Sequence, residues 1–153
     1  MTGPGPRIRP SLPTDGPSLG DVWLDAWRAT FDFPPAHPDD AVRRWLAEEM
    51  APNHEVWVAE DEVGRVVAFI ALSATDVDQL YVASAWIGHG LGRRLLDLAK
   101  GERPAGLELW CFQANERARR FYERNGFVAI HWGDGSSNEE HQPDIRYRWA
   151  PAP

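Results

Sequence analysis

The chain has 153 residues, of which 43% are apolar and 25% are charged. This size and composition predict one domain over residues 1–153, with enough apolar side chains for a core. They exclude a disordered chain and a membrane-spanning one, because no apolar run approaches the length of a spanning helix. The net charge of -7 argues against a nucleic-acid partner, which requires a basic surface, and suits a cationic substrate.

Strand and helix patterns alternate along the whole chain. In chain order the sequence predicts strand 7–9, helices 19–31 and 39–50, strands 55–59, 66–72 and 77–83, helix 92–100, strand 107–112, helix 116–125 and strands 127–131 and 145–149. We expect Asp39 or Asp40 to cap the second helix, Asn115 to cap the fourth, and Gly126 to end the fourth in a left-handed conformation. Hairpins followed by strand–helix–strand crossovers predict a mixed α/β domain, with a mixed sheet that has helices on both faces.

The sequence lacks the features of a disulfide, a metal site and an export signal. Cys111 is the only cysteine, so the chain forms no internal disulfide. The five histidines include no HExxH pattern, and one cysteine cannot build a cysteine-rich site, so we expect no metal. Residues 1–10 lack the apolar segment of a signal peptide. These features predict a cytoplasmic protein without a membrane partner.

Three alternating glycines follow a predicted strand and open a predicted helix. The spacing of Gly88, Gly90 and Gly92 allows successive backbone N–H groups to converge on an anion, and the helix dipole and Arg93 add positive charge. A pyrophosphate is the expected ligand. The dinucleotide fingerprint does not fit, because its third glycine would fall on Arg93, and the Gly-Lys-Ser/Thr of a P-loop is absent. A tight strand-to-helix turn without a ligand is the alternative.

These motifs resemble those of a known family. The glycine spacing resembles the acetyl-CoA loop of the GNAT superfamily of N-acetyltransferases. The segment 115–127 resembles the second GNAT signature, with its Asn, Ala, Phe-Tyr and Gly-Phe positions, and 80–82 resembles the strand that contacts CoA. The resemblance covers nearly the whole chain and is strongest over 76–127. It implies a GNAT-like α+β fold with a mostly antiparallel central sheet of about six to seven strands, and acetyl-CoA as cosubstrate.

The resemblance also implies which residues bind the cosubstrate. They are Leu80, Tyr81, Val82, Gly88, His89, Gly90, Leu91, Gly92, Arg93 and Asn115. The strand at 80–82 is implied to splay from 107–112, so that free backbone groups bond to the acetyl carbonyl and the pantetheine arm. Two positions depart from the family pattern, because Ile87 replaces a usual Gln or Arg and Ser84 replaces a frequent Pro. The alternative is therefore a non-catalytic module that binds or senses CoA.

Catalytic roles follow from the same resemblance. Tyr122 matches the position of the family's general acid. A phenol stays protonated at neutral pH and can donate its proton to the leaving thiolate. The alternative is that Tyr122 is an aromatic residue of the core. Asp76 lies where some members of the family carry a Glu that acts as general base. Asp78 is expected on the same face of the strand, because side chains two residues apart in a strand point the same way. The alternative is that both carboxylates lie at the solvated start of a strand. No histidine lies beside Cys111 in the sequence, so we expect direct transfer without an acyl-enzyme.

The acceptor is implied to be an amine. Trp27 and Phe31 match the helix end that lines the acceptor cleft in the family, where an aromatic wall can hold a cation. The residues expected in the ordinary core are Trp23, Trp45, Trp57 and Trp110. We expect Asp134 and the pair 139–140 either to face the acceptor or to lie on a solvated loop. The expected reaction acetylates a primary amine of a small molecule; a protein or peptide acceptor is the alternative, and monomer and homodimer both stay open.

Overall fold

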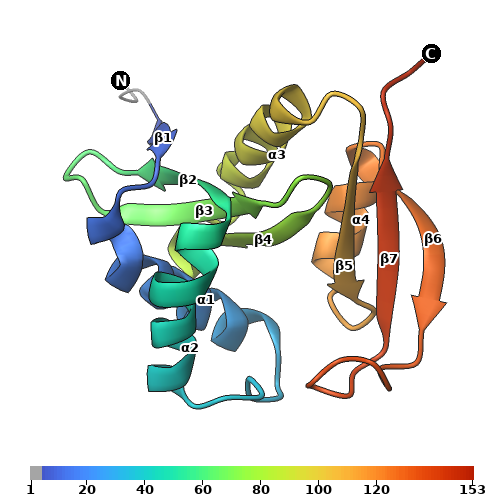
Figure 1. The fold of residues 1–153 in the computed structure, drawn as a ribbon, viewed down its shortest axis with the longest axis horizontal. Coiled ribbons are helices and arrows are strands. Elements are labelled where there is room, and N and C mark those ends of the chain that lie inside the picture. Colours follow the sequence, from blue (N-terminus) through green and yellow to red (C-terminus); the bar gives the residue numbers. More distant parts are fainter. Residues whose placement is uncertain (1–4) are drawn as a thin grey trace.

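Seven strands form two antiparallel sheets in the computed structural model of the protein, which describes residues 5–153 (Figure 1). The first sheet has the order β1-β2-β3-β4 and contains β1 (Arg7–Pro10), β2 (Glu55–Glu60), β3 (Val66–Leu72) and β4 (Val77–Val82). The second has the order β5-β7-β6 and contains β5 (Leu107–Phe112), β6 (Val128–Gly133) and β7 (Asp144–Trp149). All seven predicted strands are confirmed to within two residues at each end. The assignment of 1–153 to one domain stays a prediction, and residues 1–4 lie outside the described part.

The helices also follow the predicted pattern. They are α1 (Gly16–Thr30), α2 (Asp39–Trp45), α3 (Leu91–Glu102) and α4 (Glu116–Arg124). The second predicted helix changes after Trp45 into a π-helical turn, Leu46–Met50. Asn115 caps α4 by accepting a hydrogen bond from the backbone N–H of Ala118 at 3.2 Å, and Gly126 follows α4 with φ of 90°.

The predicted cap of α2 is wrong. Pro38, in an extended conformation, is the N-cap residue, and both aspartates lie in the first helical turn. Their carboxylates turn outward to arginines instead, because Asp39 pairs with Arg28 and Asp40 approaches Arg44.

Helices cover both faces of the first sheet. Helices α1 and α2 share one apolar core with Val66 and Phe69, and α3 shares the other with Val67 and Ile70. Every residue of β3 is buried, which explains why this strand is a continuous apolar run in the sequence.

The second sheet is covered differently. Helix α4 packs on one face, through Tyr122 against Tyr147. On the other face the side chain of Trp110 is 55% exposed and lies over the guanidinium of Arg146 at 5.3 Å. The expectation that Trp110 belongs to the core is therefore wrong, and so is that for Trp45, which is 42% exposed on α2.

The two sheets meet at one point and then diverge. Asp76 and Glu108 form an isolated parallel bridge, and the Glu108 N–H donates to the carbonyl of Thr75 at 3.0 Å. Beyond the bridge, β4 and β5 pair with other strands and separate (Figure 1). The predicted splay is confirmed, and in residues 5–153 the parallel component of the mixed sheet is confined to this bridge.

Asp15 is a buried acidic residue at the start of α1. Its carboxylate accepts hydrogen bonds from both terminal nitrogens of Arg9 at 2.8 and 3.0 Å, and from the N–H of Leu12 at 2.7 Å. These contacts, the Arg9 guanidinium first, hold the pKa of Asp15 below its ordinary value. Because the folded pKa is the lower one, Asp15 stabilises the fold above its ordinary pKa of about 3.9, and this stabilisation is lost as the pH falls further.

We therefore expect Asp15→Asn to reduce the free energy of unfolding at pH 7 by about 1–3 kcal/mol. The difference from the unmodified protein should shrink below about pH 4. Urea unfolding at pH 7 and pH 3 measures both values. Asp21→Asn, at a carboxylate that is 68% exposed and pairs with Arg43, is the control and should have a small effect. A difference for Asp15→Asn that is the same at both pH values would contradict the assignment.

Candidate active site

A cleft of about 1810 Å³ opens where β4 and β5 diverge. Eleven of the predicted site residues line it: Phe31, Leu80, Tyr81, Val82, Gly88, Gly90, Leu91, Gly92, Arg93, Asn115 and Tyr122. Three do not. His89 turns against the ring of Trp86, and Trp27 and Asp76 lie elsewhere, as described below.

The edge of β4 presents backbone groups to this cleft. The Ala83 N–H donates to the carbonyl of Val67 at 2.8 Å, and Leu80 and Val82 lie opposite Ile70 and Ala68 of β3. Neighbouring residues of an antiparallel strand direct their N–H and C=O groups to opposite sides. The polar groups of Leu80 and Val82 therefore point away from β3, into the gap between the sheets.

The glycine loop ends at the N-terminus of α3. Gly88 and Gly90 have φ of 85° and 81°, a region that favours glycine. The first helical hydrogen bond runs from the Arg94 N–H to the carbonyl of Gly90 at 3.1 Å, so the N–H groups of Leu91, Gly92 and Arg93 have no partner within the helix. This arrangement, with the positive end of the helix dipole, suits a phosphate.

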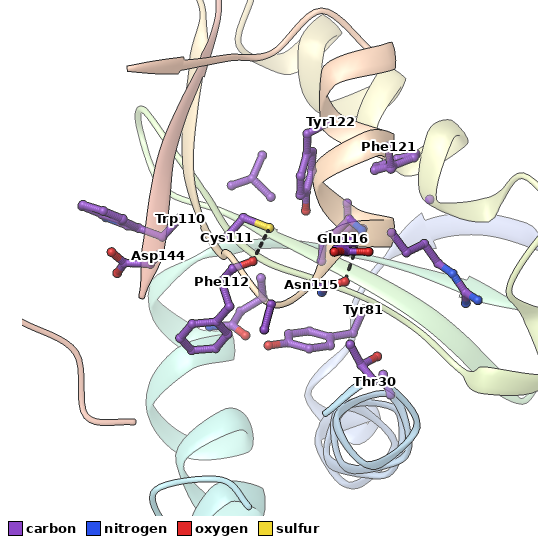
Figure 2. Close-up of a pocket in the computed structure, with 18 of the residues that line it drawn as sticks. Thr30, Tyr81, Trp110, Cys111, Phe112, Asn115, Glu116, Phe121, Tyr122 and Asp144 are labelled. Carbon is purple, nitrogen blue, oxygen red and sulfur yellow. Dashed lines mark hydrogen bonds between the residues drawn. The ribbon is translucent and has the colours of Figure 1, made fainter. Parts of the chain in front are cut away.

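Tyr122 projects from α4 toward the centre of the cleft. Its side chain is buried, and its ring packs edge-on against Phe121 and Phe127 at centroid distances of 5.2 and 5.6 Å. The hydroxyl points into the cleft, and none of residues 5–153 forms a hydrogen bond with it (Figure 2). Burial raises the pKa of Tyr122 well above its ordinary value, so the phenol carries its proton at any physiological pH.

Cys111, which belongs to β5, lies beside Tyr122 but is unreactive. The side chain is buried, and burial raises the pKa of the thiol to about 12. Its only polar contact among the described residues is a weak one, at 3.5 Å, to the carbonyl of Phe112. A thiol without thiolate character is a poor nucleophile, which supports direct transfer over an acyl-enzyme.

The two candidate bases occupy different places. Asp76 accepts hydrogen bonds from Arg146 at 2.7 and 3.1 Å and does not line the cleft. Asp78 does line it. The pairing of β3 with β4 passes from Leu72–Val77 to Ala71–Gln79, so Asp78 is an extra residue in a β-bulge. A bulge breaks the alternation of side chains, and the expectation that both carboxylates share one face is wrong for that reason.

The aromatic wall of the cleft differs from the expected one. Trp27 is buried, stacks on Trp23 at 4.8 Å, and donates its indole N–H to the carbonyl of Phe33 at 2.9 Å, so it belongs to the core. Phe31 lines the cleft and meets Phe112 edge-on at 5.4 Å. Trp110 lines the cleft as well, although the sequence placed it in the core. The period of two along β5 was the available signal, because it puts Trp110 on the face opposite Leu109 and Cys111.

The basic and the acidic side chains of the cleft come largely from different elements. Arg93 comes from α3, and Arg117 and Arg124 come from α4, which also contributes Glu116. Asp78 of β4, Asp134 of the β6–β7 loop and Asp144 of β7 also line it. Figure 2 shows Asp144 and Trp110 on one side of the cleft, with Asn115 and Glu116 on the other. Asp134 and Asp144 form no ion pair with a described lysine or arginine, so their negative charges are not neutralised by one.

Two further properties bear on the class of protein. Within residues 5–153, no group of three His, Cys, Asp or Glu side chains is placed to hold a metal ion. None of the described helices combines the length and apolarity needed to cross a membrane.

Comparisons with known proteins agree with this geometry. The family described as "Acetyltransferase (GNAT) domain" matches residues 52–129, which is half of the chain. Peptidyl-lysine N-acetyltransferase YjaB of Escherichia coli is 35% identical over 124 residues, 78% of this chain and 80% of that protein. Probable N-acetyltransferase Rv2775 of Mycobacterium tuberculosis is 30% identical over 137 residues, 79% of each. The solution structure of apo YjaB from E. coli superposes with a TM-score of 0.78 and 27% identity, covering 95% of this chain and 98% of that one.

The chain therefore belongs to the GNAT family of acetyltransferases and is an acetyl-transferring enzyme. GNAT acetyltransferases use acetyl-CoA.

Proposed function

We propose that the protein transfers the acetyl group of acetyl-CoA to a primary amine of a cationic small molecule by direct attack. The placement of basic and acidic side chains of the cleft on different elements carries this proposal. The arginines from α3 and α4 suit the phosphates of CoA, and the aspartates from β4, β7 and the β6–β7 loop suit an ammonium group. The hydroxyl of Tyr122 points into the cleft (Figure 2).

The cosubstrate binds along two consecutive elements. Its pyrophosphate contacts the N–H groups of the glycine loop and of the first turn of α3. Its pantetheine arm lies beside β4 as an added strand, hydrogen-bonded to the backbone of Leu80 and Val82. Asn115 contacts the arm while its side chain caps α4. The side chain of Ile87 has no hydrogen-bond donor, so Arg93 provides the positive charge near the phosphates.

The reaction needs three proton transfers. The acceptor arrives as an ammonium ion and loses a proton to Asp78, directly or through a water molecule. Its nitrogen then forms a bond to the acetyl carbon, and collapse of the tetrahedral oxyanion breaks the carbon–sulfur bond. The thiolate of CoA takes the proton of Tyr122, and the tyrosinate then takes the second proton from the amide nitrogen, which leaves a neutral amide and restores the phenol. Burial in the cleft disfavours the phenolate and the thiolate alike. The free energy of proton transfer from Tyr122 to the sulfur is therefore closer to zero than in water.

The direct test is release of free CoA thiol in the presence of monoamines, diamines and lysine-containing peptides. We expect release that depends on the acceptor and is fastest with small cationic amines. If acetyl-CoA binds and no member of the panel releases thiol, the module that senses CoA is the better assignment.

A lysine side chain of a peptide is the second candidate acceptor. Two observations favour it: a relative of this chain is named a peptidyl-lysine N-acetyltransferase, and Trp110, which lines the cleft, is widely exposed. Faster thiol release with lysine peptides than with every small amine would favour this second acceptor.

Asp144 tests the role of the acidic side chains. Its carboxylate lies against Gly133, where there is no room for a Cβ atom, and accepts a hydrogen bond from Asn138 at 3.1 Å. We expect Asp144→Asn to raise the KM of a diamine about fivefold at low salt, with little change in kcat and less effect at high salt. Glu62→Gln, in the distant β2–β3 turn, removes the same charge and is the control. Equal effects of the two variants would contradict a local role for Asp144.

A further inference from the structure

A histidine that precedes one strand of the first sheet and an aspartate within another meet beside the cleft. His54 immediately precedes β2, and Asp78 lies in β4, with β3 between them. The Nε2 atom of His54 lies 2.7 Å from Oδ2 of Asp78. The two side chains are 21% and 34% exposed, so the contact is partly shielded from water.

The other ring nitrogen of His54 is also held. Its Nδ1 lies 2.8 Å from the carbonyl oxygen of Met50, whose buried side chain anchors the end of the π-helical turn. Both partners of the ring are hydrogen-bond acceptors. Two N–H groups on His54, or one N–H together with a proton on Asp78, satisfy both contacts. Both hydrogen bonds of the ring can therefore form only when the pair carries one proton in addition to those of a neutral imidazole and a carboxylate.

Only the aspartate reaches the substrate. Asp78 lines the cleft, whereas His54 does not. The β-bulge leaves Asp78 without a partner in the ladder to β3, and bulges are common next to active sites because they redirect a side chain. The neighbouring charges are already paired, since Glu55 binds Arg103 at 3.1 Å and Asp76 binds Arg146 at 2.7 Å.

We infer that His54 is a positioning residue that holds Asp78 toward the cleft and shares the proton that Asp78 takes from the acceptor. This inference rests on the proposed function. In the step, an N–H bond of the ammonium breaks, its electron pair stays on nitrogen as the attacking lone pair, and the proton is held between Asp78 Oδ2 and His54 Nε2. The proton leaves to solvent after the product dissociates, which restores the pair.

Two substitutions separate positioning from proton sharing. His54→Ala removes both, and we expect kcat to fall about 10²-fold with little change in the KM of acetyl-CoA. His54→Gln keeps a side-chain N–H group that can hold Asp78 but cannot take up the proton. We expect a smaller loss of kcat, and an acidic limb of the pH–kcat profile that moves to lower pH, because a carboxylate alone is the weaker base. His37→Gln is the matched control, since His37 contacts Glu139 at 2.8 Å on an exposed surface.

A second measurement does not depend on turnover. In the NMR spectrum of the protein without substrate, recorded at a pH below the acidic limb where the pair holds the additional proton, we expect downfield ring N–H resonances that His54→Gln removes. Asp78→Asn should shift the Nε2–H resonance and leave the Nδ1–H resonance in place. Unchanged kcat and pH profile in both His54 variants overturn the inference, and so does the absence of any effect of Asp78→Asn on the ring resonances. If no amine is acetylated but the resonances behave as stated, the failure belongs to the proposed acceptor and not to the pair.

Discussion

Tyr122→Phe is expected to lower kcat by about 10²-fold while the affinity for acetyl-CoA changes little. The substitution keeps the ring between Phe121 and Phe127 and removes only the hydroxyl that points into the cleft. The leaving thiolate then has no adjacent acid. Steady-state kinetics give kcat, and equilibrium binding gives the affinity.

Tyr147→Phe provides a matched control for this substitution. Tyr147 is buried within the same core, and its hydroxyl donates to Glu123 at 2.6 Å, outside the cleft lining. Loss of this hydrogen bond should reduce the free energy of unfolding by about 1 kcal/mol and leave kcat nearly unchanged. If Tyr122→Phe retains full turnover with a good acceptor, Tyr122 serves only in packing.

Gly90→Val is expected to abolish the thermal stabilisation that acetyl-CoA gives the protein. Gly90 is the N-cap residue of α3 with φ of 81°, a conformation that a β-branched residue adopts only with strain. The substitution therefore alters the backbone where successive N–H groups bind the pyrophosphate. Without the substitution, saturating acetyl-CoA should raise the melting temperature, because a ligand that binds only the folded state stabilises it by mass action.

The same strain can be introduced elsewhere. Gly64 lies in the β2–β3 turn with φ of 81°, and a side chain at either glycine would meet no atom within 4 Å. Gly64→Val should therefore lower stability in the absence of ligand and keep the full shift with acetyl-CoA. An equal shift in Gly90→Val, or no shift in the unmodified protein with either acetyl-CoA or CoA, would refute the position of the pyrophosphate.

Much of the fold was predictable because its signals are local. The strand at 66–72 follows from a continuous apolar run and the helix at 116–125 from apolar periodicity, and the ends of this helix follow from Asn115 and Gly126. Pro38 shows the limit of such signals. Two aspartates follow it and either seemed a natural cap, but arginines on other turns compete for their carboxylates.

The site was predictable where two motifs fix the backbone, and less so where side chains depend on tertiary contacts. The β-bulge at Asp78 leaves no mark in the sequence, so simple alternation could not separate it from Asp76. The ion pair that removes Asp76 from the cleft needs Arg146, seventy residues away. His54 carried no motif at all, and only the pairing of the strands brings it to Asp78.

The divergence of β4 and β5 has a consequence for solubility. A strand edge with free N–H and C=O groups invites pairing with other chains, and many sheets hide such edges under charges, prolines or loops. Here the free edges of β4 and β5 diverge from a shared bridge and line one cleft, so we expect each one to hinder a second molecule from pairing with the other. Arg146 binds both Asp76 and Glu108 at the end of the cleft where the two sheets meet, and thereby fixes the separation between the edges of β4 and β5. We therefore expect a substitution of Arg146 to disturb the shape of the cleft and also to expose the two strand edges to pairing with other chains.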